Sequence, residues 1–154
     1  MKRSLVTAAA AALVLVAASL GLAQTEKKAT PAKKAVTKKA VYASPDQAKF
    51  KDAPNNDGVS MAVLHGDPDK GAHATYTKFK PGYDAGWHTH TADVWIIGIK
   101  GAYLYKDDAG EKRIGPGEYI RVPGGHKHWS GGDKTEGALF FEEGSGKFDL
   151  IPAK

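Results

Sequence analysis

The chain has 154 residues, with 18 glycines, 8 prolines and no cysteine, and its formal net charge is +5. This length suits one domain of ordinary size, and so many glycines and prolines argue against a helical bundle. The lack of cysteine excludes disulfide scaffolds, thiol nucleophiles, zinc ribbons and iron–sulfur sites. Metal chemistry would therefore depend on carboxylates and on the 6 histidines, which all lie between His65 and His128.

Residues 1–23 have the pattern of a secretory signal peptide. Two basic residues precede an uncharged, apolar stretch at 5–20, and the small residues after it predict cleavage between Ala23 and Gln24. A permanent membrane span is the alternative, but a span needs about 20 strongly apolar residues, and much of this stretch is alanine. We therefore expect an exported protein, either periplasmic or extracellular.

Residues 24–41 are predicted to be a basic, disordered linker, because Lys, Ala, Thr and Pro cannot bury enough apolar surface to fold. The linker could touch an anionic cell-wall or membrane surface, but a solvated spacer is the favoured interpretation. The remainder, 42–154, holds 14 basic and 16 acidic side chains. The positive net charge therefore does not indicate a nucleic-acid partner.

From residue 42 onward, short runs rich in β-branched and aromatic residues alternate with Gly, Pro and Asp turns. This pattern predicts an all-β domain, most naturally a double-sheet jelly-roll barrel. One run, Val94–Ile99, is apolar at both parities, which predicts that an N-terminal strand or a second subunit of a homodimer covers its outer face. The expected strands are Val59–Leu64, Ala72–Lys80, Val94–Ile99, Ala102–Lys106, Glu118–Val122, Ala138–Glu142 and Phe148–Ile151.

Two pairs of histidines are the strongest chemical signal in the chain. His88 and His90 are two residues apart, as are His126 and His128. Side chains at positions i and i+2 of a strand point to the same face, so each pair could present two imidazoles to one metal ion. Imidazole suits Zn, Cu, Fe and Ni, and binds them in its neutral form.

The glycines and prolines around these pairs resemble the two sequence motifs of the cupins. Gly82 is followed after five residues by His88-Thr89-His90 and then, after ten residues, by Gly101. The second motif runs from Gly117 through Pro123-Gly124-Gly125 to His128. The resemblance covers 59–151 and implies a jelly-roll barrel, often dimeric, that holds one divalent metal (Fe, Cu, Mn, Zn or Ni). By this resemblance, His88, His90 and His128 match the family's three histidine ligands.

The chain departs from the cupin pattern at the acidic ligand of the first motif. The position where the family usually has glutamate is Val94, and its neighbour Asp93 would point away from the histidines unless a β-bulge turned it inward. This leaves a three-histidine site with open positions. The candidates for a further contact are Asp93, His126, Glu142 and Glu143, with His126 favoured as a neighbour of the ligands rather than a ligand.

Such a site favours an exported metalloenzyme that acts on a small molecule, with a dioxygenase-type oxidoreductase as the leading subclass. The alternative is a non-catalytic protein of the periplasm that binds a metal or a small ligand. Most of the aromatic side chains should form core and cavity walls, and a few could line a substrate pocket. The candidates for that pocket are Tyr76, Trp95 and Tyr103.

Overall fold

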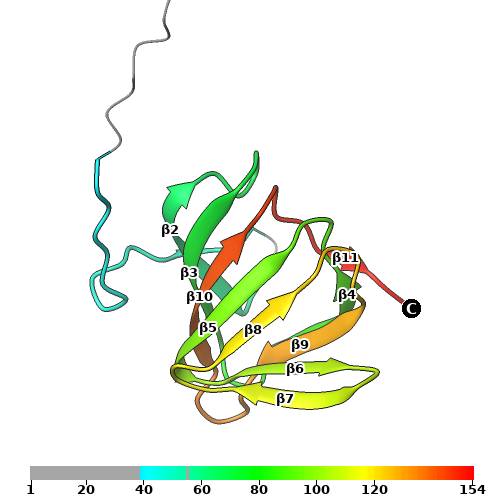
Figure 1. The fold of residues 1–154 in the computed structure, drawn as a ribbon. Helices are drawn as coiled ribbons and strands as arrows, with labels where there is room; N and C mark the ends of the chain where they lie inside the picture. The colour runs from blue at the N-terminus through cyan, green and yellow to red at the C-terminus, as the bar shows by residue number, and fades with distance from the viewer. Residues whose placement is uncertain (1–38, 55) are drawn as a thin grey trace, which may run out of the picture. The chain divides into compact units, whose positions relative to one another are not determined.

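The computed structural model describes residues 39–54 and 56–154. The expected signal peptide and almost all of the expected linker lie outside these residues. Within them, every regular element is a β-strand, as Figure 1 shows. No helix that is long and apolar enough to cross a membrane occurs in this part of the chain.

The strands form two antiparallel sheets. The larger sheet has the order β1 (Lys51–Asp52), β2 (Val59–Gly66), β3 (His73–Phe79), β10 (Ala138–Gly144), β5 (Val94–Gly101) and β8 (Tyr119–Val122). The smaller sheet has the order β11 (Ile151–Pro152), β4 (Asp84–Thr89), β9 (His128–Gly132), β6 (Tyr103–Asp107) and β7 (Gly110–Ile114). Apart from β1–β2–β3 and β6–β7, neighbours in each sheet are not consecutive in the chain, which crosses repeatedly between the two sheets, as in a jelly roll.

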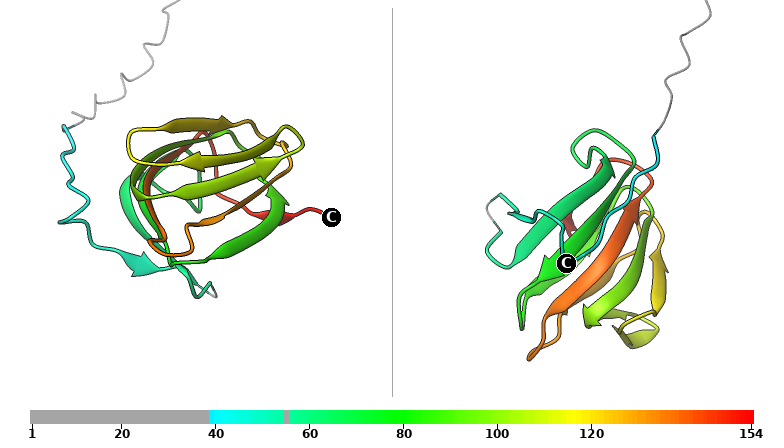
Figure 2. Two further views of the ribbon diagram at one scale, coloured as in Figure 1. Left: turned by 90° about the horizontal axis from the view of Figure 1, so that it is seen from below. Right: turned by 90° about the vertical axis from the view of Figure 1, so that its left-hand side faces the viewer.

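The two sheets face each other, as the two ribbon views in Figure 2 show, and side chains between them form the core. Every second residue of the central strands points inward. Side chains from both sheets meet there, and Phe140 of β10 is completely buried. The core cluster consists of Val94, Ile96, Tyr103, Tyr105, Ile114, Val122, Ala138 and Phe140. The expected all-β jelly-roll barrel is confirmed.

The strands that the sequence pattern did not predict are those without an apolar alternation. In β7 the first four residues are exposed and three of them are charged, so this strand is recognisable only by its pairing with β6. At the end of the chain, the expected run Phe148–Ile151 forms a strand only at Ile151–Pro152. The backbone before it instead donates a hydrogen bond from Phe148 N to Pro68 O.

The outer face of β5 is only partly covered in this structure. Ile97 is 40% exposed and its neighbour across β8, Tyr119, is 59% exposed. The segment before β1 lies instead on β3, which β10 separates from β5. There Tyr76 donates a hydrogen bond to Ala43 O, and the Lys78 ammonium lies over the Phe50 ring. A second subunit on the outside of β5 therefore stays a prediction.

Candidate metal centre

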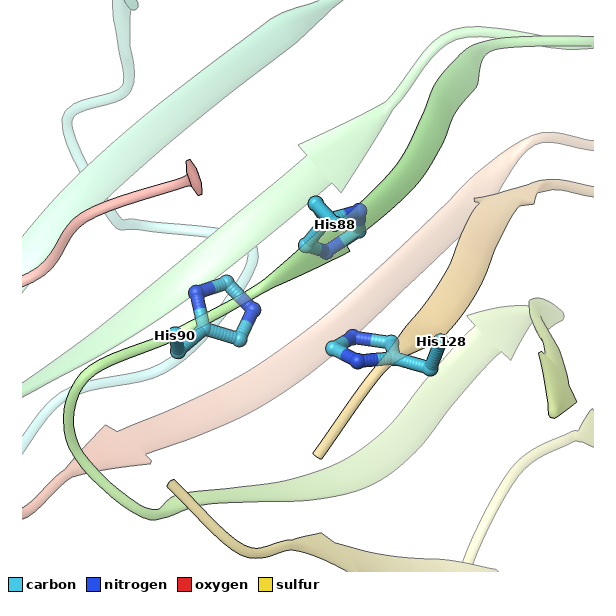
Figure 3. A group of neighbouring side chains, drawn as sticks. All are labelled: His88, His90 and His128. Atoms are coloured by element: carbon cyan, nitrogen blue, oxygen red, sulfur yellow. The ribbon is translucent and has the colours of Figure 1, made fainter. Parts of the chain in front are cut away.

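Three histidines gather at one point on the inner face of the smaller sheet. His88 in β4 and His128 at the start of β9 are direct partners across the strand pair, and His90 comes just after the end of β4. Figure 3 shows the three rings turned toward a common centre. One nitrogen from each ring lies within 4.8 Å of the other two, and no carboxylate belongs to this group among the described residues.

Backbone carbonyl groups orient all three rings in the same way. The Nδ1 atom of His88 lies 2.8 Å from Gly86 O, that of His128 lies 3.0 Å from His126 O, and that of His90 is hydrogen-bonded to Asp149 O. Because a carbonyl oxygen only accepts, each neutral ring carries its hydrogen on Nδ1. The lone pair of each ring is therefore on Nε2, which is the arrangement that metal-binding histidines use.

The three histidines are buried, with exposed fractions of 1%, 7% and 0% for His88, His90 and His128. Burial disfavours the charged imidazolium, so it lowers the pKa of His88 and His90 and lowers that of His128 to about 4. The rings are therefore neutral near neutral pH. The Nε2 atom of His128 is buried with no hydrogen-bond partner among the described residues. A buried polar atom is costly to leave unpaired, so this nitrogen fits the role of a metal ligand.

Glycines shape the backbone on both sides of the cluster. Gly86 has a φ of 71°, in the left-handed region, and follows an irregularity in the pairing of β4 with β9. Its carbonyl is thereby aimed at His88 Nδ1. Gly124 lies so close to the turn after His90 that a Cβ atom there would be 2.4 Å from Thr91 O. The two sequence motifs are thus packed against each other backbone to backbone.

Asp93 lies outside the histidine cluster. Its Oδ2 accepts a hydrogen bond from Arg121 at 2.5 Å, and its Oδ1 accepts one from Gly124 N at 2.8 Å. These contacts hold the pKa of Asp93 below its usual range, the backbone contact first and the guanidinium second. The structure therefore gives Asp93 a role in tying β5 to the turn before β9. Val94 next to it points into the barrel with His88 and His90.

The side chain of His126 also points away from the cluster. Its Nε2 lies 3.0 Å from Asp107 Oδ2, which also accepts a hydrogen bond from the Tyr105 hydroxyl at 2.8 Å. The Tyr105 ring in turn stacks on the ring of His128, with centroids 5.4 Å apart. His126 therefore contacts His128 through its own backbone carbonyl and, indirectly, through Asp107 and Tyr105.

A cavity of about 270 Å³ opens beside His88 and His90 between the two sheets. Tyr103 lines it, as predicted for a pocket residue. Glu142, a candidate for a further metal contact, also lines the cavity, while Glu143 points to the outer face near Tyr119. Glu142 is 7% exposed, and burial raises its pKa to about 7. A larger depression of about 510 Å³ on the outer face of the smaller sheet contains none of the three histidines.

The pocket assignment of Tyr76 and Trp95 has to be corrected. Both lie on the outer face of the larger sheet, because they alternate with inward-facing residues of β3 and β5. Tyr76 packs edge-on against Phe141, and Trp95 borders a shallow depression with Tyr119. Neither is among the residues that line the cavity.

Several cavity residues were missed by sequence reasoning. Ser130 has the same parity as His128 in β9 and lines the cavity, so strand parity alone could have indicated it. Phe148 lies beside the His90 ring, with centroids 5.6 Å apart, and belongs to an irregular segment. Asn56, in the loop before β2, reaches the cavity without any local sequence signal.

A family model for the ChrR cupin-like domain matches residues 38–145. The chain belongs to the ChrR cupin-like family. The match spans both histidine pairs and ten of the eleven strands that the described residues form. A search of curated protein sequences found no significant match.

Solved structures support the cupin fold of this ChrR cupin-like chain. The polyketide cyclase RemF from Streptomyces resistomycificus has a TM-score of 0.62 at 16% identity, over 75% of this chain and 87% of that one. A cupin-like protein of unknown function from Ralstonia eutropha JMP134 has a TM-score of 0.61 at 24% identity, over 75% and 79%. The protein KdgF from Halomonas sp. has a TM-score of 0.53 at 19% identity, over 66% and 91%. At these identities the likeness establishes the fold alone.

Proposed function

We propose that this cupin binds one divalent transition metal through the Nε2 atoms of His88, His90 and His128 and uses it in an enzymatic reaction of a small molecule. The observation that supports the metal most directly is His128 Nε2, which is buried, neutral and without a partner. The other two rings present their lone pairs to the same space.

The donor set is chemically selective. Three neutral imidazoles suit Fe, Cu, Zn and Ni, whereas Mn prefers carboxylate and water oxygens. Of the metals that the sequence allows, Mn is therefore the least favoured. Three protein ligands leave coordination positions open, and the adjacent cavity gives a small molecule access to them.

We favour a dioxygenase-type oxidoreductase as the subclass, because an iron or copper ion with open positions supplies oxygen chemistry when bound. The apolar side chains of the cavity, such as Ile96 and Phe148, exclude water and position the substrate. The Tyr103 hydroxyl, Ser130 and Glu142 are the polar groups that can orient it or exchange a proton with it. Similar structures include the polyketide cyclase RemF and DMSP lyases, which carry other chemistries on this fold.

Metal content followed by oxygen uptake tests this function. The protein would be purified from its native export route, dialysed, and measured for Fe, Cu, Zn, Ni and Mn per chain. Each metal-loaded form would then be supplied with small phenols and diketones in an oxygen electrode. We expect about one metal per chain and oxygen uptake by the iron or copper form. Bound metal without turnover in any form would favour the alternative, a non-catalytic binding protein.

We also propose that the protein is exported and acts in the periplasm or outside the cell. The support is the residue pattern of 1–23, and the basic residues of 24–41 could add a weak contact with an anionic surface. N-terminal sequencing of the exported protein should find Gln24 at the start. Recovery of an intact Met1 from that pool would contradict export by a cleaved signal peptide.

A further inference from the structure

The cavity beside the histidines has an unusual charge character. Its walls are mainly apolar, and none of the residues that line it within the described chain is Lys or Arg. Its polar groups are amide, hydroxyl and imidazole groups together with a single carboxyl, that of Glu142. Apart from a bound metal ion, nothing in this cavity can therefore neutralise an anionic ligand.

Glu142 is deeply buried but has no hydrogen-bond donor directed at it. It lies in β10, opposite Thr75 of β3 and Ile96 of β5. Its exposed fraction is 7%, so more than nine-tenths of the residue is buried. The Thr75 hydroxyl is hydrogen-bonded to that of Thr77 instead, at 2.9 Å. In the described part of the chain, no group forms a hydrogen bond with the Glu142 carboxyl, and burial alone raises its pKa.

His73 is close to Glu142 but forms no hydrogen bond with its carboxyl group. Its Nε2 is 4.0 Å from Glu142 Oε1, which is beyond hydrogen-bond distance. Its Nδ1 lies 3.0 Å from both Gly71 O and Gly146 O, so the neutral ring carries its hydrogen there and turns a lone pair toward Glu142. The carboxyl oxygens of Glu142 are thus left to accept a hydrogen bond from whatever enters the cavity.

We propose that Glu142 selects the ligand of this cavity: a small, neutral, mostly apolar molecule with a hydroxyl group that donates to the Glu142 carboxylate, in preference to a carboxylate of the same shape. The hydroxyl donor satisfies a buried acceptor, whereas a carboxylate would place two negative groups together in an enclosed space. This proposal deepens the metal-dependent function above by naming the substrate class.

Benzyl alcohol and benzoate form a matched pair of probes. Their dissociation constants would be measured by ligand-observed NMR at about pH 8.5, where Glu142 is ionised, on the zinc-loaded chain and on the chain stripped of metal. In the stripped wild-type protein we expect benzyl alcohol to bind at least about 10-fold tighter than benzoate, the size of one hydrogen bond to a charged group. Equal or tighter binding of benzoate there, or no binding of benzyl alcohol, would overturn the proposal.

Glu142→Gln tests the residue itself, because the amide keeps the shape of the side chain but can donate a hydrogen bond to a carboxylate. We expect the preference for benzyl alcohol to shrink about 10-fold, mainly through tighter benzoate binding. Glu143→Gln, on the outer face of the same strand, is the matched control and should leave the ratio unchanged. A Glu142→Gln ratio equal to that of wild type would contradict the proposal, provided that thermal unfolding shows a folded variant.

The two states of the protein separate this proposal from the metal function. Selectivity in the stripped chain together with failure to bind zinc would remove the metal function and leave the role of Glu142 standing. Normal zinc binding with no effect of Glu142→Gln on the ligand preference would leave the metal function standing and remove the role of Glu142.

Discussion

The Nδ1 atom of His128 lies 3.0 Å from the backbone carbonyl oxygen of His126, so these two histidines differ in role although they are two residues apart. The contact fixes His128 with Nε2 toward the cluster. It uses the backbone of His126, whose side chain is directed to Asp107 instead. Substitution of the two residues should therefore have unequal effects on the metal.

His128→Ala should abolish metal binding, because it removes a ligand from the centre of the cluster. His126→Ala keeps the carbonyl that orients His128, so this variant should retain about one metal per chain. Its metal affinity should fall by about 10-fold or less, which is the smallest loss typical of residues that orient a ligand. Metal stoichiometry of the two purified variants would decide this. Complete loss of metal in His126→Ala would mean that its side chain joins the site.

Gly124→Ala should destabilise the fold and weaken the metal site together. A Cβ atom at Gly124 would be 2.4 Å from Thr91 O, next to His90, so the turn must move. We expect a loss of about 1–3 kcal/mol in the free energy of unfolding, typical of overpacking, and weaker metal binding.

Gly117→Ala is the matched control for that variant. Gly117 has a φ of 79°, but no atom lies within 4 Å of a Cβ placed there. The cost should be the strain of a left-handed residue alone, about 1 kcal/mol, with unchanged metal affinity. Denaturant unfolding and metal titration check both variants, and a metal effect at Gly117 would contradict the local explanation.

The three histidines should retain their metal to a lower pH than solvent-exposed histidines with ordinary pKa values would. Burial lowers the pKa of all three rings, that of His128 from 6.5 to about 4. The neutral forms that bind metal therefore persist below pH 6.5, and protons should displace the metal only at a pH clearly below 6.5. Metal retention after dialysis across this range is the measurement. Half-loss near pH 6.5 would show that the rings are more solvated than the structure indicates.

In the metal-free protein, the raised pKa of Glu142 should make the free energy of unfolding fall as the pH rises, which is opposite to the effect of the buried histidines. Burial raises its pKa from 4.5 to about 7, so the folded state binds more protons than the unfolded state between these values. Its contribution to stability is then largest at low pH and is lost as the pH rises through about 7, amounting to a few kcal/mol in order of magnitude. The buried histidines act in the opposite direction, so wild type alone would not isolate it.

The difference between Glu142→Gln and wild type does isolate this effect. Glutamine does not ionise, so the variant should unfold at a higher temperature than wild type at about pH 8 and at a similar temperature at about pH 4.5. Thermal unfolding in the presence of a chelator measures it. An identical temperature difference at both pH values would mean that Glu142 is not buried as an acid.

The sequence was sufficient to predict the barrel and the three clustered histidines, because turn residues and the spacing of two motifs are local signals. It left Asp93 open as a further metal contact, because a regular strand directs that side chain away from the histidines and a β-bulge would turn it inward. It could not assign the Arg121 partner of Asp93, which depends on the register of β5 with β8.

The walls of the cavity were harder to predict for a related reason. Val94–Ile99 is apolar on both faces, so its composition alone does not tell which parity faces the core. The structure shows that Trp95 shares the outward parity of Asp93 and lies outside the pocket. Glu142 and Glu143 are adjacent, and only the assembled sheet decides which of them is buried. Long-range register, rather than any local pattern, determines these positions.

The metal content of the full chain, measured beside that of His128→Ala, decides whether the three histidines hold a metal ion. Both proteins would be expressed and dialysed in parallel, and Fe, Cu, Zn and Ni would be counted per chain by elemental analysis. We predict about one bound transition-metal ion per wild-type chain and none in His128→Ala, with both proteins folded. A wild-type chain that holds no metal, even after each ion is supplied, would contradict the account.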